Sequence, residues 1–374
     1  MSSKKAIVVG AGIVGLATAR ALALNGYSVT VIEKTNKAVG ASIRNFGMLW
    51  PIGQPDGKLY NRAIRSRDVW KEIAAATNIW FEDAGSLHLA HHDDEWQVMQ
   101  ELQSNFFAAG RPVKLMDKNT IGEKYPVVNT DGLIGGLYSA TETIVDPREA
   151  IVKVPVYLKE KHAIEFIWGR VVTKVEEGKV WMGQVFLQAD LICVCSGADF
   201  ETLFPEQFAA LDITKCKLQM MRFSEKNNAR IGTSLCGGLS LIHYHSFKVA
   251  PSLKKLEQRY HSEMKAYLDW GIHVMVSQNE SGEFTVGDSH EYANTFDPFD
   301  KALINEMILN YLKNFVVCNG WKLTQSWHGI YPKMTNGESG IFLNPLPCVY
   351  IVNGVGGAGM TMSFGFAEEC INSL

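Results

Sequence analysis

Three glycines near the start of the chain have the spacing of a loop that binds a dinucleotide pyrophosphate. The segment VVGAGIVGL places Gly10, Gly12 and Gly15 in a GxGxxG pattern, and the acidic Glu33 follows further along. In such a loop the first glycine makes the turn, the second lets the backbone approach the pyrophosphate, and the third allows close helix packing. The carboxylate can accept hydrogen bonds from ribose hydroxyls and disfavours a ribose 2′-phosphate. We therefore expect FAD or NAD as the ligand, and not NADP.

A strand, a helix and a second strand are needed to hold these groups in place. Residues 5–9 form a short apolar run rich in β-branched side chains, and the apolar positions after Gly12 keep a helical period until Gly26. Residues 27–33 have the composition of a second strand. The N-terminus of the intervening helix would offer unpaired N–H groups to the anion. The complete unit predicts a Rossmann-type fold more strongly than an isolated glycine motif does.

The residues that follow this unit decide which dinucleotide is expected. Residues 39–50, VGASIRNFGMLW, together with the turn GVGGAGM at 354–360, resemble the D-amino-acid oxidase superfamily, which includes glycine oxidase and sarcosine oxidase. The resemblance covers most of the chain and is loosest over 85–141 and 218–326. It implies FAD as the cofactor. The alternatives are an NAD-linked dehydrogenase and a flavin-binding protein without turnover.

The resemblance assigns contacts with FAD to several segments. A hydroxyl on the loop after the second strand would reach the phosphates, which matches Ser42, and residues 45–48 would run beside the isoalloxazine. The backbone of Val172 would meet the adenine, and a strand would end in a cofactor-facing turn at Ser196 and Gly197. The residues assigned to FAD in this way are Gly10, Gly12, Ile13, Val14, Gly15, Glu33, Lys34, Ser42, Asn45, Phe46, Gly47, Met48, Val172, Ser196, Gly197, Gly356, Gly357, Gly359, Met360 and Thr361.

The second glycine turn distinguishes a flavin enzyme from a nicotinamide enzyme. A nicotinamide enzyme needs one such loop, whereas a flavin enzyme holds the ADP end with one turn and the isoalloxazine with another. The positive end of the helix after Gly359 would stabilise the negative charge that gathers on a reduced flavin. We expect Gly357 and Gly359 to adopt dihedrals open only to glycine, or to allow close approach of the cofactor. The alternative is that these glycines only permit tight packing of strand and helix.

The implied fold class is α/β: a Rossmann-type FAD-binding domain interleaved with an α+β substrate domain built on a mainly antiparallel sheet. The FAD-binding domain is expected over 1–84, 142–217 and 327–374, and the substrate domain over 85–141 and 218–326. No cysteine lies where sarcosine oxidase tethers its flavin. FAD is therefore expected to bind without a covalent link.

Two shorter segments carry local predictions. Residues 240–250, SLIHYHSFKVA, have a strand-like pattern that would place His243 and His245 on one face. Asp146 precedes a proline at the start of an amphipathic stretch, which predicts a capped helix. We interpret Asp146 and Arg148 as structural residues.

One histidine-rich segment, LHLAHHDDEW, raises the question of a metal site. It contains His88, His91, His92, Asp93 and Asp94. No tetrahedral cysteine or histidine spacing accompanies it. We therefore expect no metal there, with Asp93 or Asp94 capping a helix and the histidines on the surface.

The substrate prediction rests on a departure from the family pattern. Glycine oxidase-like members carry an arginine before the proline of the loop WHGIYPKMTNG, and its guanidinium binds the substrate carboxylate. Tyr331 stands at that position here. A tyrosine can donate one hydrogen bond but cannot neutralise a carboxylate.

A different acidic group therefore becomes plausible for the substrate. The segments ASIRNFGMLWPIGQ, LIHYHSF, GDSHEY, WHGIYPK and GGAGMTMSFG resemble a subgroup associated with phosphonate catabolism. This resemblance implies a small anionic amine, namely an aminoalkylphosphonate such as 2-aminoethylphosphonate or a hydroxylated relative. The alternative is glycine, sarcosine or another small amino acid bound by a displaced cation.

The candidate residues for catalysis and substrate binding follow from these segments. Candidate catalytic residues are Tyr331, His328 and His245. Candidate substrate-binding residues are Arg44, Asn45, Met48, His243, His245, Ser289, His290, Tyr331 and Lys333. The alternatives are hydrogen-bonded core histidines and, for Arg44, a salt bridge at the surface.

Composition limits the possible partners. The 374 residues carry a formal charge of −3, so no basic excess is available to neutralise a run of phosphates and nucleic acid is not expected. The seven cysteines are expected to be reduced. No run reaches about 18 apolar residues, so no membrane span is expected and the cytoplasm is the expected compartment. Oxygen or another acceptor would reoxidise the flavin, and a homo-oligomer is possible.

Overall fold

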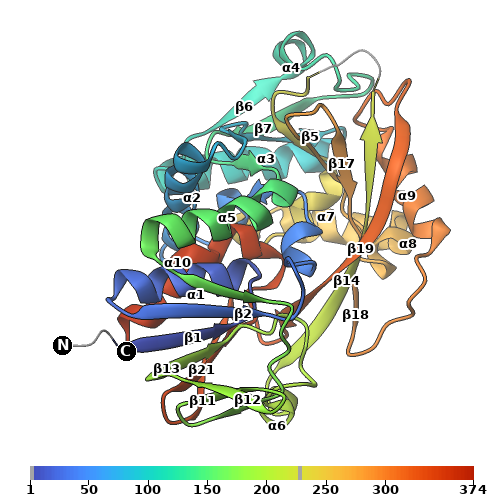
Figure 1. Cartoon of the computed structure of the whole chain (residues 1–374). Helices are drawn as coiled ribbons and strands as arrows, with labels where there is room; N and C mark the ends of the chain where they lie inside the picture. The colour runs from blue at the N-terminus through green and yellow to red at the C-terminus, as the bar shows by residue number, and fades with distance from the viewer. Residues whose placement is uncertain (1–3, 226–229) are drawn as a thin grey trace.

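Two large sheets organise the chain, whose computed structural model describes residues 4–225 and 230–374 (Figure 1). The first sheet has the order β20-β21-β13-β1-β2-β9 and is parallel except for the pairing of β20 with β21. Its strands are β1 (Lys5–Val9), β2 (Ser28–Glu33), β9 (Glu165–Trp168), β13 (Leu191–Val194), β20 (Ile341–Leu346) and β21 (Val349–Asn353). Strand β1, helix α1 (Ile13–Leu24) and β2 form the predicted strand–helix–strand unit.

Both faces of this sheet are buried, as a parallel sheet requires. Along β1 the side chains of Ala6 and Val8 enter one apolar core, and those of Ile7 and Val9 enter the other. The first core is closed by α1, α2 (Lys58–Thr77), α5 (Pro147–His162) and α10 (Gly359–Asn372). The second is closed by a small sheet of β10 (Lys174–Glu176), β11 (Lys179–Met182) and β12 (Val185–Gln188).

The second large sheet has nine strands and is antiparallel except where β15 pairs with β5. Its order is β18-β14-β17-β16-β15-β5-β7-β6, and β19 pairs with β14. The strands are β5 (Ser86–Ala90), β6 (Val113–Asp117), β7 (Gly135–Ser139), β14 (Ile213–Ser224), β15 (Ser234–Cys236), β16 (Met275–Gln278), β17 (Phe284–Gly287), β18 (Glu291–Ala293) and β19 (Lys322–Met334). The predicted fold class, a Rossmann-type part with a mainly antiparallel second part, is confirmed.

The long strands β14 and β19 lie side by side and extend from the second sheet toward the first (Figure 1). The predicted domain boundaries at 217 and 327 fall inside these two strands. Their register pairs Cys216 with Tyr331 and Gln219 with His328. Residues that we assigned to the FAD-binding part and residues that we assigned to the substrate part therefore share one continuous pair of strands.

The remaining elements fill the edges and loops. Three short strands form a second small sheet: β3 (Met48–Leu49), β4 (Phe81–Glu82) and β8 (Thr143–Val145). The other helices are α3 (Asp93–Ala108), α4 (Lys118–Lys124), α6 (Pro205–Ala209), α7 (Leu253–Glu263), α8 (Lys265–Asp269) and α9 (Ala302–Leu312). Short 3-10 segments are η1 (Ala41–Ile43), η2 (Pro51–Gly53), η3 (Gly238–Ile242), η4 (His245–Val249) and η5 (Gly356–Ala358).

The predicted strand over residues 240–250 is wrong, because η3 and η4 occupy this segment. The hydroxyl of Ser240 donates a hydrogen bond to the carbonyl of Gly237 at 2.5 Å. A serine side chain that bonds to nearby backbone competes with extended structure in this way. His243 and His245 therefore do not alternate along a strand.

Two predictions for the histidine-rich segment are also corrected. His92 is the N-cap of α3, whereas Asp93 and Asp94 lie in its first turn. The carboxylate of Glu95 accepts hydrogen bonds from the N–H groups of His91 and His92, which completes the cap. His88 is not a surface residue, because it lies in the fully buried strand β5.

The predicted cap of α5 is confirmed. The carboxylate of Asp146 accepts a hydrogen bond from the N–H of Arg148 at 2.9 Å, and the two side chains form an ion pair. The Arg148 guanidinium also reaches Glu283 at 2.8 Å. Both residues therefore hold α5 against the turn between β16 and β17.

Two sequence predictions concern the cysteines and membrane-spanning helices. All seven cysteines are free, and only Cys318 and Cys348 are not buried. Within residues 4–225 and 230–374, no helix combines the length and the apolar character that crossing a membrane requires.

Candidate active site

A cavity of about 1700 Å³ lies along the first sheet's glycine turns and continues to the second sheet. Residues from the beginning, the middle and the end of the chain line it. Both glycine turns that the sequence singles out face this one cavity. It is therefore the candidate site for the cofactor and for the substrate together.

The first glycine turn has the geometry that the motif predicts. Gly10 has a φ of +103°, and a Cβ there would overlap the carbonyl of Cys195. A Cβ on Gly15 would overlap the carbonyl of Gly10. A Cβ on Gly12 would lie 3.2 Å from the hydroxyl of Ser42. Neither Gly10 nor Gly15 can carry a side chain in this backbone.

Glu33 and Ser42 both point at this turn. The buried carboxylate of Glu33 accepts a hydrogen bond from the N–H of Ala11 at 2.9 Å and another from the N–H of Thr35 at 3.0 Å. The hydroxyl of Ser42 accepts one from the N–H of Ile13 at 2.8 Å, in the first turn of α1. An acidic acceptor and a hydroxyl thus flank a helix N-terminus, which suits a ribose and a pyrophosphate.

The second glycine turn corrects one expectation. Gly354 and Gly356 have positive φ values of 73° and 64°, whereas Gly357 does not and Gly359 is helical at −53°. Neither Gly357 nor Gly359 therefore needs glycine for its dihedral angles. A Cβ at Gly357 would lie 3.3 Å from the hydroxyl of Tyr331.

The N-termini of α1 and α10 lie together at the cavity. A Cβ on Gly359, the first residue of α10, would lie 3.6 Å from a methyl of Ile13, the first residue of α1. Figure 1 shows the two helices side by side under α5. Two positive helix ends can therefore stabilise negative charge on one ligand.

Nearly all residues assigned to FAD from the sequence line the cavity. Gly47 does not, so we correct that assignment. Its φ is +75°, and a Cβ there would overlap the carbonyl of Val145. Gly47 thus serves backbone packing. Asn45 lines the cavity and also holds the loop, because its amide donates to the carbonyls of Ala41 and Ser42.

Tyr331 and Lys333 line the cavity from strand β19. Tyr331 is buried, and burial raises the pKa of its hydroxyl well above the usual value. The ammonium of Lys333 donates a hydrogen bond to the hydroxyl of Tyr292 at 2.8 Å. Burial lowers the pKa of Lys333. No described carboxylate forms an ion pair with this lysine.

Arg44 also lines the cavity, at the end of η1. Its guanidinium donates a hydrogen bond to the carbonyl of His328 at 3.1 Å. Among the described residues no acidic side chain pairs with it, so the alternative of a surface salt bridge does not hold. The ring of His328 is engaged elsewhere, with the carboxylate of Asp300 at 2.8 Å.

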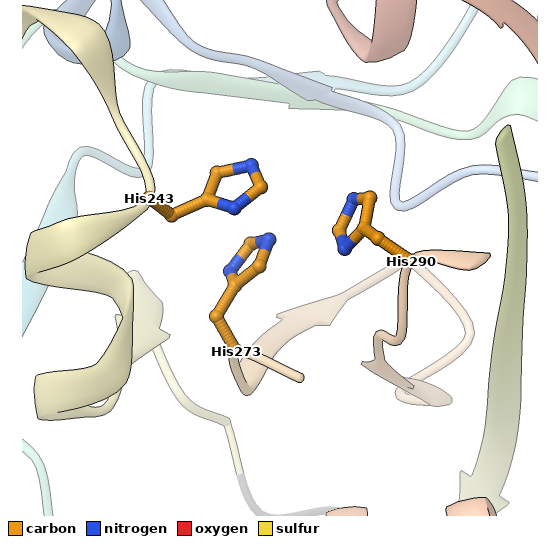
Figure 2. Close-up of side chains that lie close together, drawn as sticks. All are labelled: His243, His273 and His290. Carbon is orange, nitrogen blue, oxygen red and sulfur yellow. The ribbon is translucent and has the colours of Figure 1, made fainter. Parts of the chain in front are cut away.

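Three histidines from separate segments meet at one wall of the cavity (Figure 2). His243 follows η3, His273 precedes β16 and His290 follows β17. One ring nitrogen from each lies within 4.8 Å of the others. His243 is open to the cavity, whereas His273 and His290 are buried. Within the described residues this is the one group of side chains whose spacing could accept a metal ion.

The carboxylate of Asp288 lies under these rings. It is 3.3 Å from Nε2 of His273 and 3.8 Å from Nε2 of His290. Burial raises the pKa of Asp288 and lowers the pKa of His243 and His273. The pKa of His290 falls to about 4, mainly through burial. The cluster therefore carries little positive charge at neutral pH.

Sequence reasoning missed His273 and Asp288. His273 lies in an apolar stretch without a motif. In the segment GDSHEY we selected Ser289 and His290 as candidates and did not select Asp288. Ser289, one of those neighbours, is corrected: it does not line the cavity, and its buried hydroxyl accepts a hydrogen bond from the N–H of Gln219. His290 and His243 belong to the cluster. His245 and Met48 line the cavity outside it.

Residues 5–372 match the family described as FAD dependent oxidoreductase, DAO. The structure is similar to L-proline dehydrogenase from P. horikoshii, with a TM-score of 0.80 and 19% identity over 99% of this chain and 93% of that one. It is also similar to glycine oxidase from Bacillus cereus, with a TM-score of 0.78 and 16% identity over 99% and 94% of the two chains. These likenesses concern the fold.

Curated relatives match a shorter stretch. Glycerol 3-phosphate dehydrogenase of Caloramator mitchellensis is 28% identical over 149 residues, which is 38% of this chain and 30% of the relative. Mitochondrial sarcosine dehydrogenase of Mus musculus is 26% identical over 151 residues, 39% of this chain and 16% of the relative. The matched stretch thus spans less than a third of each of these relatives.

Proposed function

The chain belongs to the DAO family of FAD-dependent oxidoreductases, and from that premise we propose that it oxidises a small primary amine bearing an anionic group. The proposed substrate is an aminoalkylphosphonate, such as 2-aminoethylphosphonate or a hydroxylated relative. The products are the aldehyde and ammonia. Oxygen or another acceptor then takes the electrons.

The cavity residues fit FAD. Glu33 and Ser42 sit at the first glycine turn for the ribose and phosphates, and the N-terminus of α10 lies at the second turn. FAD supplies the atom, N5, that accepts a hydride. We propose non-covalent binding, because Cys195 is the one cysteine among the described residues that lines the cavity. Its thiol is buried, with a pKa raised to about 12, and is therefore unreactive.

The observation that carries the substrate proposal is the set of cations around Tyr331. Tyr331 replaces the expected arginine and packs against Gly357, beside the second glycine turn. Lys333 and Arg44 line the same cavity from different elements, and neither has a carboxylate partner among the described residues. A phosphonate has three oxygens and up to two charges, so separate cations suit it better than one planar guanidinium does.

The chain's part in the reaction is to bind and orient. The substrate must lose a hydride from the carbon that bears nitrogen and a proton from the nitrogen, which leaves an imine. Water then adds to the imine and releases ammonia. A pocket that fixes the anionic end places the carbon–hydrogen bond at one position and so lowers the barrier through orientation.

The test is flavin reduction without oxygen. The FAD-loaded protein is mixed with 2-aminoethylphosphonate, its 1-hydroxy derivative, glycine, sarcosine or D-alanine, and the loss of the long-wavelength flavin absorbance is followed. Rapid bleaching by a phosphonate, with slow or no bleaching by the amino acids, supports the proposal. Efficient bleaching by the amino acids alone contradicts it and favours the alternative of a glycine or sarcosine oxidase.

A further inference from the structure

The histidine cluster is not used by the proposed contacts of Arg44, Lys333 and Tyr331, yet it lines the same cavity. The rings of His273 and His290 lie nearly parallel, with an interplanar angle of 14°, whereas the ring of His243 is tilted by 31° to His273 and by 39° to His290. The ring centroids of His243 and His273 are 3.7 Å apart. This stack of three rings brings one nitrogen of each to within 4.8 Å of the others.

A stack of this kind fits several acceptor atoms better than a single metal ion. The lone pair or N–H of an imidazole nitrogen lies in the plane of its ring, and metal bonds of about 2.0–2.1 Å must converge on one point. The planes of His273 and His290 are nearly parallel with ring centroids 5.1 Å apart, so their in-plane nitrogens point at separate positions. The three oxygens of a tetrahedral oxyanion occupy separate positions, and each can accept a hydrogen bond.

Tyr292 connects the stack to Lys333. The ring of His290 stacks on Tyr292, with centroids 6.5 Å apart, and the hydroxyl of Tyr292 accepts the hydrogen bond from Lys333. The charge of Lys333 acts on all three histidines and helps to keep them neutral. An anion between Lys333 and the rings would offset the repulsion between the lysine charge and a protonated histidine.

We infer that the edge of His243, His273 and His290, together with Lys333, is the subsite for the tetrahedral oxyanion of the substrate. This inference rests on the proposed function and assigns its anionic group to a defined wall of the cavity. The anion binds with uptake of protons by the stack.

Proton uptake follows from the hydrogen bonds of the rings. Nδ1 of His290 lies 2.9 Å from the carbonyl of Gly271, which can only accept, so this nitrogen carries the proton. Its Nε2 then needs a second proton to donate to an anion. Nε2 of His273 lies 3.3 Å from Asp288, and a nearby anion would favour the charged form of each ring.

Other ionisable groups lie near the stack and affect the protonation of its rings. They are Asp288, Lys333, Tyr244, Tyr292, Tyr331, Cys216 and His88. Asp288 is the acidic member and lacks a lysine or arginine partner among the described residues. Its carboxyl lies 3.3 Å from Nε2 of His273, so its protonation is coupled to that of the stack.

The test uses ethylphosphonate, which has no amine and cannot be oxidised. Isothermal titration of the oxidised, FAD-loaded protein in two buffers of different ionisation heat measures proton uptake at about neutral pH. We expect net uptake of protons, and affinity that falls about tenfold per pH unit for each proton taken up as the pH rises. Binding without net uptake overturns the inference.

Variants separate this subsite from the rest of the cavity. His243→Asn and His290→Gln should each weaken ethylphosphonate binding at least about tenfold and reduce proton uptake. His261→Asn, at an exposed histidine on α7, is the matched control and should bind as the parent does. If the cluster variants also bind as the parent, with circular dichroism unchanged, the subsite lies elsewhere.

Two further outcomes keep this inference apart from the proposed function. Histidine-dependent binding of ethylphosphonate without flavin reduction by aminophosphonates supports the subsite and refutes the proposed oxidation. Binding that a chelator abolishes and Zn²⁺ restores shows that the stack is a metal site and overturns the inference.

Discussion

The hydroxyl of Ser42 accepts a hydrogen bond from the N–H of Ile13 at 2.8 Å, which ties η1 to the first turn of α1. The same N-terminal turn is bordered by Glu33 on β2 and by Gly359 at the start of α10. The end of β2, the nearby η1 and the distant start of α10 are thus held around one end of α1. This arrangement suits a cofactor whose phosphates lie at the start of α1.

Glu33→Arg should weaken FAD retention several-fold or more. The substitution removes the acceptor for ribose hydroxyls and also the bonds from Ala11 and Thr35. The measurement is the ratio of flavin to protein after gel filtration. Glu306→Arg, on an exposed turn of α9, is the control and should retain FAD. Equal retention in both variants would mean that Glu33 does not bind the ribose.

Ser42→Ala should have a smaller effect. It removes one neutral hydrogen bond, which contributes on the order of 1 kcal/mol, so the dissociation constant of FAD should rise roughly five-fold. Fluorescence titration of the apoprotein with FAD measures this. A loss of FAD as large as that of Glu33→Arg would indicate that the loop itself has been disrupted.

Gly359→Ala separates a cofactor role from a folding role. Its backbone is helical and the nearest atom to a new Cβ is 3.6 Å away, so the thermal stability of the apoprotein should be unchanged or slightly higher. FAD affinity should fall if the cofactor lies against this glycine. Gly15→Ala, whose Cβ would overlap the carbonyl of Gly10, should lower both stability and FAD content. Unchanged FAD affinity in Gly359→Ala would place the flavin away from the start of α10.

Lys333→Met should raise the KM for 2-aminoethylphosphonate at least about tenfold, because it removes a cation from the proposed anion subsite. Reduction by an amine without an acidic group, such as ethylamine, should change little. Lys322→Met, at the exposed start of the same strand, is the control. An equal loss for both amines would show that Lys333 does not act on the anion.

The pH dependence of substrate binding should follow the protonation of Lys333. Burial lowers the pKa of this lysine, so its positive charge is present at low pH and is lost at a lower pH than in a free lysine. Affinity for the phosphonate should therefore fall as the pH rises through the lowered pKa. Lys333→Arg should move that fall to higher pH, because a guanidinium keeps its proton. An unchanged profile would assign the titration to another group.

The FAD-binding half could be predicted because its signals are local in the chain. Gly10 and Gly15 are required by contacts within one turn and one neighbouring strand, and Glu33 ends the strand that follows the helix. Such spacing leaves few geometries for the backbone, so the glycine pattern and the helix period were enough to predict the strand–helix–strand unit. The cap at Asp146 was predictable for the same reason, since its partner is two residues away.

The substrate side was decided by tertiary structure. His243, His273 and His290 meet because β16 and β17 pair as a hairpin and the N–H of Gly237, at the start of η3, bonds to the carbonyl of Val274 beside it. Ser289 and His290 are adjacent in the chain, yet the backbone turns one toward Gln219 and the other into the cavity. Residue types and spacing determined the family and the cofactor. Which ionisable side chains face the substrate depends on contacts between distant segments, and only the folded chain determines these.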